Sequence, residues 1–154
     1  MKLRYDRGMR RLPALLALLP ALVQAGPLRH FDVIAEFVAP RRAGGSGHVA
    51  VSFRALDPDV HVNESPAPRL KLDIAQAVLL DRQLPPPSHV PDYDPLTARY
   101  VDLSKPVLFP VAIAPAAPRG EQLVKASVVF FYCSQREAWC RRGTADVEIP
   151  VNVR

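Results

Sequence analysis

The sequence predicts an all-β protein built as an antiparallel β-sandwich, and three observations lead to this fold class. Seventeen prolines are spread over most of the chain, and each one removes a backbone donor and clashes with the preceding helical turn, which excludes long helices. Apolar residues recur instead with a period of two, as in strands that bury one face. Turn-forming residues separate these runs at short intervals, as they do in sandwiches.

The first two expected strands form a hairpin. Every second residue is apolar in 31–37, and the same alternation returns in 49–55. A glycine-rich segment, 44–47, lies between them and indicates a turn. We therefore expect these two strands to pair in an antiparallel manner.

Six further strands are expected, which gives eight short strands in all and favours a sandwich. The strand ending at Cys133 is the most apolar, and its run from Val128 to Tyr132 has no alternation. Such a run indicates burial on both faces, as in a central strand. The proline-rich segment 84–95 shows no periodicity and is expected to be a surface loop. The six strands are expected at 69–73, 77–81, 98–103, 107–113, 123–133 and 145–153.

The first 25 residues have the pattern of a signal peptide. Five basic residues lie in the first eleven positions, an apolar run of about twelve residues extends from Leu12 to Val23, and Val23-Gln24-Ala25 offers a small-residue cleavage site. A membrane-spanning helix needs about 20 apolar residues, so this run is too short for one. The pattern predicts export to the periplasm and a mature soluble domain at 26–154. If cleavage fails, the segment would tether that domain to the inner membrane.

Removal of this segment changes the charge of the protein. The whole chain has a formal net charge of +5, but five of its basic residues and one acid lie in 1–25, which leaves 15 basic and 14 acidic residues afterwards. The mature chain therefore carries about +1, and the argument for binding nucleic acid is lost. At 129 residues the mature chain is expected to form one domain.

Cys133 and Cys140 are the two cysteines of the chain, and after export both would meet an oxidising compartment, where a disulfide is the default expectation. They flank one hairpin connection, with Gly143 expected to lead into the last strand. Two thiols at a hairpin end can reach the Cα separation of about 4.4–6.8 Å that a disulfide requires.

The residues around the cysteines leave the role of this bond open. Arg136, Arg141 and Arg142 lie nearby in the sequence and would favour a thiolate, whereas Glu137 would oppose it. Trp139 precedes Cys140 and could shield one sulfur or contribute to a docking surface. The bond can therefore be an exchanging pair, or a static structural disulfide that stabilises the domain by about 2.5 kcal/mol.

Other kinds of chemistry have less support in the sequence. His30, His48, His61 and His89 show no zinc-type spacing to one another or to the cysteines, so we interpret them as ordinary polar residues. The chain contains no nucleophile-elbow serine and no glycine-rich phosphate loop before a helix. We expect no cofactor. Metal handling by Cys133, Cys140 and a histidine remains a third hypothesis, although it requires reduced thiols.

Several short motifs taken together resemble a known family. They are His61-Val62-Asn63, Pro66, Pro68, Phe131-Tyr132-Cys133, Trp139-Cys140 and Ile149-Pro150-Val151. This set is similar to the N-terminal periplasmic domain of the thiol:disulfide interchange protein DsbD and to the related disulfide bond corrector domains. The resemblance covers about His30 to Val153, and its most specific part is the hairpin that carries the two cysteines.

The resemblance implies an immunoglobulin-like sandwich that relays reducing equivalents in the periplasm. Carried over by position, Cys133 and Cys140 would be the catalytic pair of a protein-disulfide reductase or electron-relay domain. The implied partners are a membrane-embedded electron donor and periplasmic thioredoxin-like proteins, encoded elsewhere. A cap loop shields the cysteines in that family, and the segment around Tyr93 is the candidate for it here. The competing hypothesis is a non-catalytic immunoglobulin-like interaction module with a structural disulfide.

Overall fold

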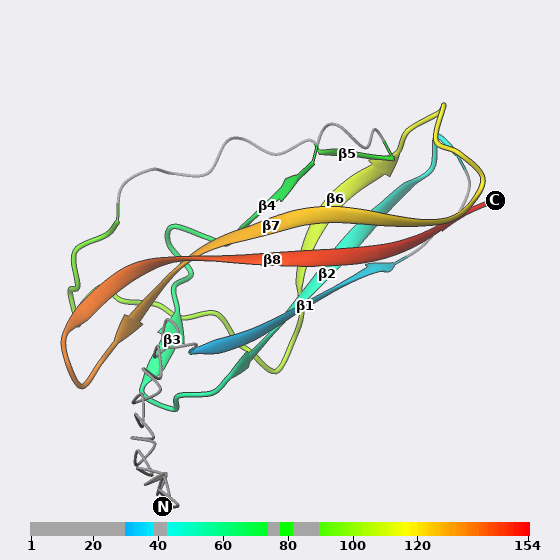
Figure 1. The fold of residues 1–154 in the computed structure, drawn as a ribbon. Helices are drawn as coiled ribbons and strands as arrows, with labels where there is room; N and C mark the ends of the chain where they lie inside the picture. Colours follow the sequence, from blue (N-terminus) through cyan, green and yellow to red (C-terminus); the bar gives the residue numbers. More distant parts are fainter. Residues whose placement is uncertain (1–29, 39–42, 74–77, 82–89) are drawn as a thin grey trace, which may run out of the picture.

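The computed structural model describes residues 30–38, 43–73, 78–81 and 90–154. These residues form eight strands and no helix, in two antiparallel sheets (Figure 1). The all-β prediction is therefore confirmed. The expected signal peptide, 1–25, lies outside the described residues. The strands are β1 (Phe31–Val38), β2 (Ser46–Ala55), β3 (Val60–Val62), β4 (Arg69–Leu72), β5 (Leu79–Asp81), β6 (Val107–Ile113), β7 (Gly120–Ser134) and β8 (Trp139–Val153).

The first sheet has the order β1-β2-β6-β5 and begins with the expected hairpin. In the register of β1 and β2, Phe31 lies opposite Ala55 and Val38 lies opposite His48. The alternation puts Val49, Val51 and Phe53 into the core while their neighbours face outwards. The period-two pattern of the sequence thus determines which face of this sheet is buried.

The second sheet is built around β7. On one side, β7 pairs with β8 along its whole length, and on the other side it pairs with β4 and β3 in succession. The prediction that this strand is central is confirmed. Every residue from Val128 to Phe131 is buried, as expected for a strand with structure on both faces.

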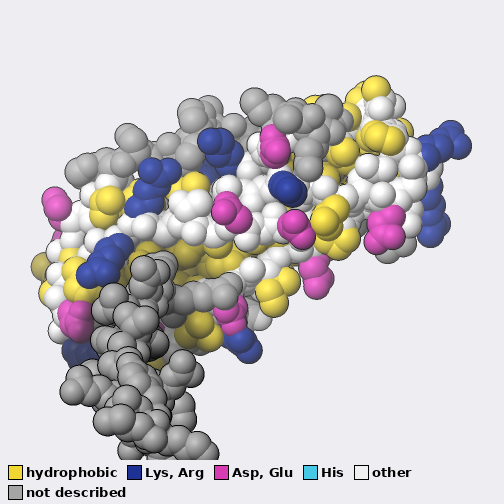
Figure 2. Space-filling model, in the orientation of Figure 1, with side chains coloured by type: hydrophobic (Ala, Val, Ile, Leu, Met, Phe, Trp, Pro, Cys, Tyr) yellow, Lys and Arg dark blue, Asp and Glu magenta, His cyan; other side chains and the backbone are white. Residues whose placement is uncertain are grey.

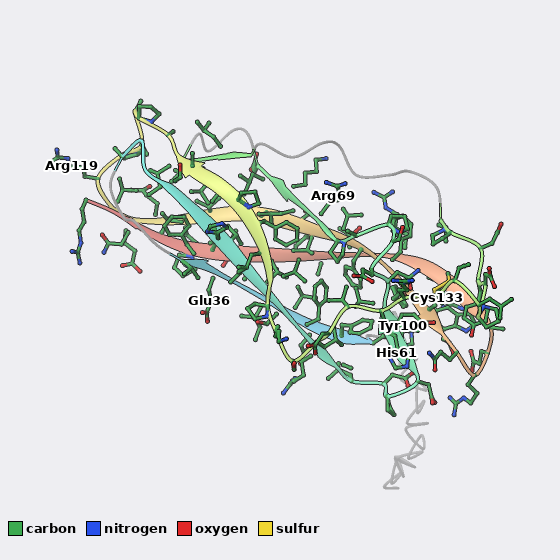
Figure 3. The ribbon with its side chains drawn as sticks, turned by 180° about the vertical axis from the view of Figure 1, so that it is seen from behind. Glu36, His61, Arg69, Tyr100, Arg119 and Cys133 are labelled. Atoms are coloured by element: carbon green, nitrogen blue, oxygen red, sulfur yellow. A yellow bond between two sulfur atoms is a disulfide. The ribbon has the colours of Figure 1, made fainter. Side chains whose placement is uncertain are left out.

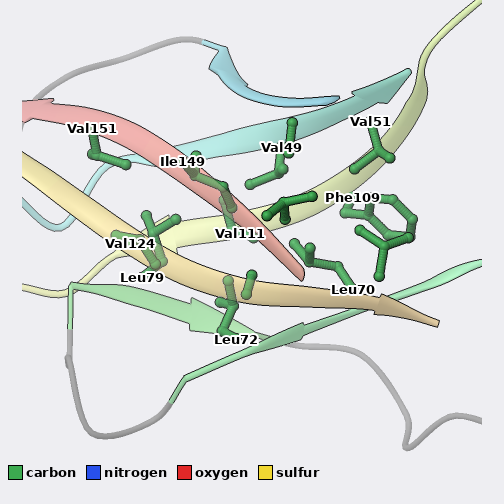
Figure 4. Packing of buried hydrophobic residues seen from close by; sticks show 14 of the residues in the cluster. Val49, Val51, Leu70, Leu72, Leu79, Phe109, Val111, Val124, Ile149 and Val151 are labelled. Atoms are coloured by element: carbon green, nitrogen blue, oxygen red, sulfur yellow. The ribbon is translucent and has the colours of Figure 1, made fainter. Parts of the chain in front are cut away.

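The hydrophobic core lies between the two sheets (Figure 4). Val49, Val51 and Val111 reach it from the first sheet, and Val124 and Ile149 reach it from the second. These side chains are at most 3% exposed. Close packing of branched apolar residues from both sheets supplies the main stabilisation of such a fold.

Three expectations about the strands are corrected by the structure. Val60–Val62 forms a strand that was not expected, whereas 98–103 was expected to be a strand and makes only the single bridge between Asn63 and Tyr100. The last strand begins at Trp139 and not at residue 145. Gly143 is consequently not a turn residue, because it lies inside β8.

The remaining predictions agree with the described residues in part. The expected strands 69–73 and 107–113 match β4 and β6. The expected strand 77–81 corresponds to β5, which begins at Leu79. Most of the proline-rich segment 84–95 lies outside the described residues, and the part from 90 onwards contains no strand.

Acidic and basic side chains are interspersed over the face drawn in Figure 2. A groove of about 1030 Å³ is lined by residues of β1, β4, β7 and β8, among them Val33, Ile34 and Val147. Neither cysteine lines this groove. Within the described part of the chain, no helix has the length and hydropathy that crossing a membrane requires.

Candidate functional site

The two cysteines lie next to the turn that joins β7 and β8. The turn consists of residues 135–138, between the strand ends Ser134 and Trp139. The Ser134 hydroxyl accepts a hydrogen bond from the backbone N–H of Glu137 at 3.1 Å, and Trp139 Nε1 donates to Glu137 Oε2 at 2.6 Å. Ala138, the last turn residue, has a positive φ of 52°. These features close a tight and well-defined hairpin.

Cys133 and Cys140 are directly opposite each other in the register and form a disulfide. On the other side of β7, Asn63 N–H donates to the Phe131 carbonyl at 2.8 Å and Gln135 N–H donates to the Asp59 carbonyl at 3.4 Å. Backbone groups of every second residue of β7 point to the same side, so the N–H and C=O of Cys133 also point towards β3. Cys133 and Cys140 are therefore a non-hydrogen-bonded pair of β7 and β8. Such pairs are the closer class, and the two Cα atoms are 4.0 Å apart, which is below the expected range of about 4.4–6.8 Å.

The disulfide lies on the outer face of the second sheet, away from the core. Val128 and Phe130 of β7 face the core, and because successive side chains alternate, Cys133 faces the opposite way. Opposite residues of an antiparallel pair share a face, so Cys140 lies on the outer face too. The sequence predicted the bond correctly, but it did not reveal this face.

The two sulfur-bearing residues differ in exposure. Cys133 is 1% exposed, whereas Cys140 is partly exposed. A nucleophile from solution can therefore approach Cys140 more readily than Cys133. The disulfide thus joins one buried residue and one partly exposed residue.

Of the three arginines near the cysteines, two are engaged elsewhere. Arg136 pairs with Asp59 at 2.9 Å. Arg141 places its Cζ 4.3 Å from the centre of the Trp139 ring, on the inner face of the sheet. Arg142 is exposed and lies opposite Phe131, on the same face as the disulfide. The electropositive surroundings expected from the sequence therefore reduce to Arg142.

Trp139 belongs to an aromatic cluster on the inner face and does not shield the sulfurs. Its ring centroid lies 5.8 Å from that of Tyr132 and 5.9 Å from that of His30. Tyr132 in turn contacts Phe31 and Phe130, with centroids 5.7 Å apart in both cases. The cluster fixes the end of β8 from beneath, so that the disulfide is carried on a packed support.

His61, interpreted from the sequence as an ordinary polar residue, is placed beside the disulfide by the pairing of the strands. It lies on β3 directly opposite Cys133, and therefore on the outer face with both cysteines. Its ring centroid is 4.9 Å from that of Tyr100, and Figure 3 shows His61, Tyr100 and Cys133 at the same end of the molecule. The alternation Val60-His61-Val62 could have indicated an outward-facing histidine, but not its partner strand.

The segment after the proline-rich region runs along the free edge of β3. Val101 N–H donates to the Val62 carbonyl at 2.9 Å, and Glu64 N–H donates to the Arg99 carbonyl at 2.8 Å. These two bonds flank the bridge between Asn63 and Tyr100. The buried Asn63 Oδ1 and Tyr100 Oη have no hydrogen-bond partner within the described residues.

The other described histidines, His30 and His48, are dispersed. His30 lies 3.4 Å from Asp57, and His48 is exposed on β2 in the other sheet. His89 lies outside the described residues. The described part of the chain contains no group of three or more His, Cys, Asp or Glu side chains placed to hold a metal ion, and the two sulfurs are bonded to each other.

The fold and the site together define an all-β protein with a cross-strand disulfide at the outer corner of a sheet. Comparison with models of protein families, with curated protein sequences and with solved structures gives no match. The resemblance of the sequence motifs to the DsbD N-terminal domain, and the cap-loop role of the segment around Tyr93, therefore stay predictions.

Proposed function

We propose that this protein is a thiol–disulfide exchange domain that relays reducing equivalents through the Cys133–Cys140 pair. The observation that carries the proposal is the unequal exposure of a disulfide outside the core, with Cys140 partly exposed and Cys133 buried. Exchange requires one sulfur that an incoming thiolate can reach. The sequence resemblance and the expected export of the mature domain 26–154 support a periplasmic setting.

The proposed reaction begins with a thiolate of a reduced donor. It attacks the Cys140 sulfur, a donor–Cys140 disulfide forms, and the electron pair of the broken bond leaves on the Cys133 sulfur. A second thiol of the donor then attacks the mixed disulfide, which oxidises the donor and leaves the domain as a dithiol. The dithiol reduces a target disulfide by the reverse sequence. By resemblance, the donor is membrane-embedded and the targets are thioredoxin-like proteins.

Single cysteine variants test this function by trapping partners. Cys133→Ser leaves the accessible Cys140 thiol and should accumulate mixed disulfides with periplasmic proteins, because the Cys133 thiol that would resolve them from within the domain is absent. Cys140→Ser leaves only the buried thiol and should trap less. The double variant is the control for non-specific adducts. The measurement is non-reducing electrophoresis of periplasmic extracts, and equal absence of adducts from both single variants would overturn the proposal.

A non-catalytic interaction module with a structural disulfide is the second candidate, and the 1% exposure of Cys133 is the observation in its favour. The two functions differ in reduction potential. A structural disulfide should lie below about −300 mV, beyond reduction by a glutathione-like pool, whereas an exchanging pair should lie well above that value. Redox titration of the purified domain against a thiol buffer decides between them.

A further inference from the structure

Building on the exchange function proposed above, we propose that His61 is a catalytic residue that supplies positive charge and a proton to the Cys133 sulfur when the disulfide opens. His61 lies on β3, a strand of three residues that pairs with β7 at Cys133. Because His61 is the register partner of Cys133 and not of Cys140, this role favours Cys133 as the sulfur that leaves when the disulfide opens.

The placement of His61 rests on the register of the sheet. His61 and Cys133 are direct partners of β3 and β7, and Cys133 and Cys140 are direct partners of β7 and β8. The three side chains therefore form one row across the outer face. Directly opposite residues have Cβ atoms about 4.5–5.5 Å apart. An imidazole at this position is within reach of the neighbouring sulfur.

Cys133 needs such a neighbour because it is buried. It is 1% exposed, and a thiolate released there would lose most of its hydration, which disfavours the charged form. Cys140 is partly exposed as a residue, so we expect its sulfur to keep more of its hydration. When Cys133 is the leaving group, the charge develops on the less hydrated of the two sulfurs.

The other charged groups of this face lie further from Cys133 in the register. Arg142 of β8 lies one row away, opposite Phe131. The turn contributes Arg136, which pairs with Asp59. The segment beyond β3 contributes Asp102, which accepts hydrogen bonds from Ser104 and lies 3.5 Å from Lys105. His61 is thus the titratable group directly next to Cys133 in this row, and counting on from the antiparallel bridge between Asn63 and Tyr100 puts Asp102 on the far side of His61.

Tyr100 holds the imidazole in place. The two rings are 4.9 Å apart at an interplanar angle of 36°, and His61 is partly buried. Backbone hydrogen bonds of Arg99 and Val101 to the edge of β3 fix the position of Tyr100 between them. A ring held in this way loses little freedom when it binds the sulfur, which favours the interaction.

The chemical step balances without any further reactant beyond the donor dithiol. The donor thiolate forms a bond to Cys140, the Cys133–Cys140 bond breaks, and the electron pair moves to Cys133. The imidazolium of His61 first stabilises that thiolate and then gives it the proton. In the reverse reaction the neutral imidazole takes the proton from Cys133 and restores the attacking thiolate.

The experiment compares the purified mature protein with His61→Gln, with His48→Gln as matched control, since His48 is an exposed histidine of the other sheet. The measurement is the rate at which dithiothreitol reduces the disulfide between pH 5 and pH 8. The ratio of wild-type to variant rates removes the titration of the reductant. We expect a ratio of about ten for His61→Gln at the acid end, where a histidine ordinarily carries its proton, falling towards one at pH 8. The His48→Gln ratio should stay near one.

Two further variants separate chemistry from packing. His61→Lys keeps a cation that does not titrate in this range, so the ratio of wild-type to His61→Lys rates should be near one at the acid end and fall below one at pH 8. In the Cys140→Ser background, His61→Gln should shift the ultraviolet absorbance of the Cys133 thiolate to higher pH. A pH-independent ratio for His61→Gln, with an unchanged thiolate titration, would overturn the role of His61.

The result of the His61→Gln rate comparison is independent of the result of the trapping experiment with the cysteine variants. Reduction by dithiothreitol needs no physiological partner, so a pH-dependent ratio for His61→Gln would stand even if neither cysteine variant traps a protein. Trapped adducts together with a pH-independent ratio would keep the exchange function and exclude His61 from it.

Discussion

Ala138 closes the turn that carries the disulfide, and it does so with a left-handed backbone. Among the described residues other than glycine, Ala138 is the one with a positive φ, at 52°. A side chain with a Cβ atom costs about 1–2 kcal/mol in this conformation, whereas glycine adopts it freely. The conformation of Ala138 therefore destabilises the turn by this free energy, and the pairing of β7 with β8 offsets it.

Ala138→Gly should raise the free energy of unfolding by about 1 kcal/mol, because it relieves this conformational cost. The measurement is equilibrium denaturation under oxidising conditions. Ala116→Gly, at an exposed turn position without positive φ, is the control and should lower stability, since glycine gains more entropy on unfolding. A loss of stability at both positions would mean that Ala138 is not left-handed in solution.

The sequence predicted which cysteines form the disulfide, but not the face of the sheet on which the neighbouring side chains lie. The pairing of Cys133 with Cys140 follows from the presence of two cysteines and their short separation. The faces of Arg141, Arg142 and Trp139 depend on where β8 begins and on its register with β7. A shift of one residue exchanges the two faces, and no local pattern in the sequence fixes that position.

At the scale of elements, the end of β8 depends on close packing between Gly143 and Phe130. A Cβ atom at residue 143 would lie 2.7 Å from Cζ of Phe130, its direct partner in the register. The Phe130 ring is 5% exposed and packs against Phe31 and Phe53 with centroids 5.7 and 5.1 Å apart. It has little room to move aside.

Gly143→Ala should therefore lower the free energy of unfolding by about 1–3 kcal/mol, the usual cost of overpacking a core. Thermal or urea denaturation checks this value. Thr144→Ala, at the next and exposed position of β8, should change stability by less than about 0.5 kcal/mol. Equal effects of the two substitutions would contradict the packing of Phe130 over Gly143.

The elements differ in how well the sequence could predict them. The hairpin of β1 and β2 was predictable because alternation marks the buried face. The strand β3 has three residues, too few to show a period, and it is stabilised by its long-range pairing with β7. Gly143 suggested a turn because glycine weakens strands, whereas here it makes room for a ring from the neighbouring strand.

At the scale of the whole molecule, the core and the disulfide are independent of each other. Residues of both sheets form the core cluster, and neither cysteine belongs to it. The disulfide closes a loop of about eight residues, for which chain entropy gives a stabilisation of about 2.5 kcal/mol. Domains of this size are stable by about 5–15 kcal/mol, so the core alone can maintain the fold.

Reduction of the bond, or the Cys133→Ser/Cys140→Ser double variant, should lower the free energy of unfolding by about 2–3 kcal/mol and leave the protein folded. Denaturation with and without reductant measures the difference, and circular dichroism should show the same strand content in both states. Cooperative unfolding on reduction at room temperature would mean that the disulfide is needed for folding.

The order of the strands could not be predicted from the sequence. The first sheet inserts β2 between β1 and β6 and adds β5 at its edge, and β7 receives β3 and β4 one after the other along the same side. These arrangements depend on contacts between residues far apart in the chain. The local period gives the fold class, and long-range packing selects the topology.

The four-residue turn already joins the two strands that the disulfide links, and their paired backbones continue from that turn to the other end of the sheet. Breaking the sulfur–sulfur bond therefore frees no part of the chain, and the loop that it opens is small. We therefore expect the oxidised and reduced forms to have the same overall shape. A partner that distinguishes the oxidised from the reduced form then has to contact the sulfur atoms themselves, because it cannot recognise a change of shape.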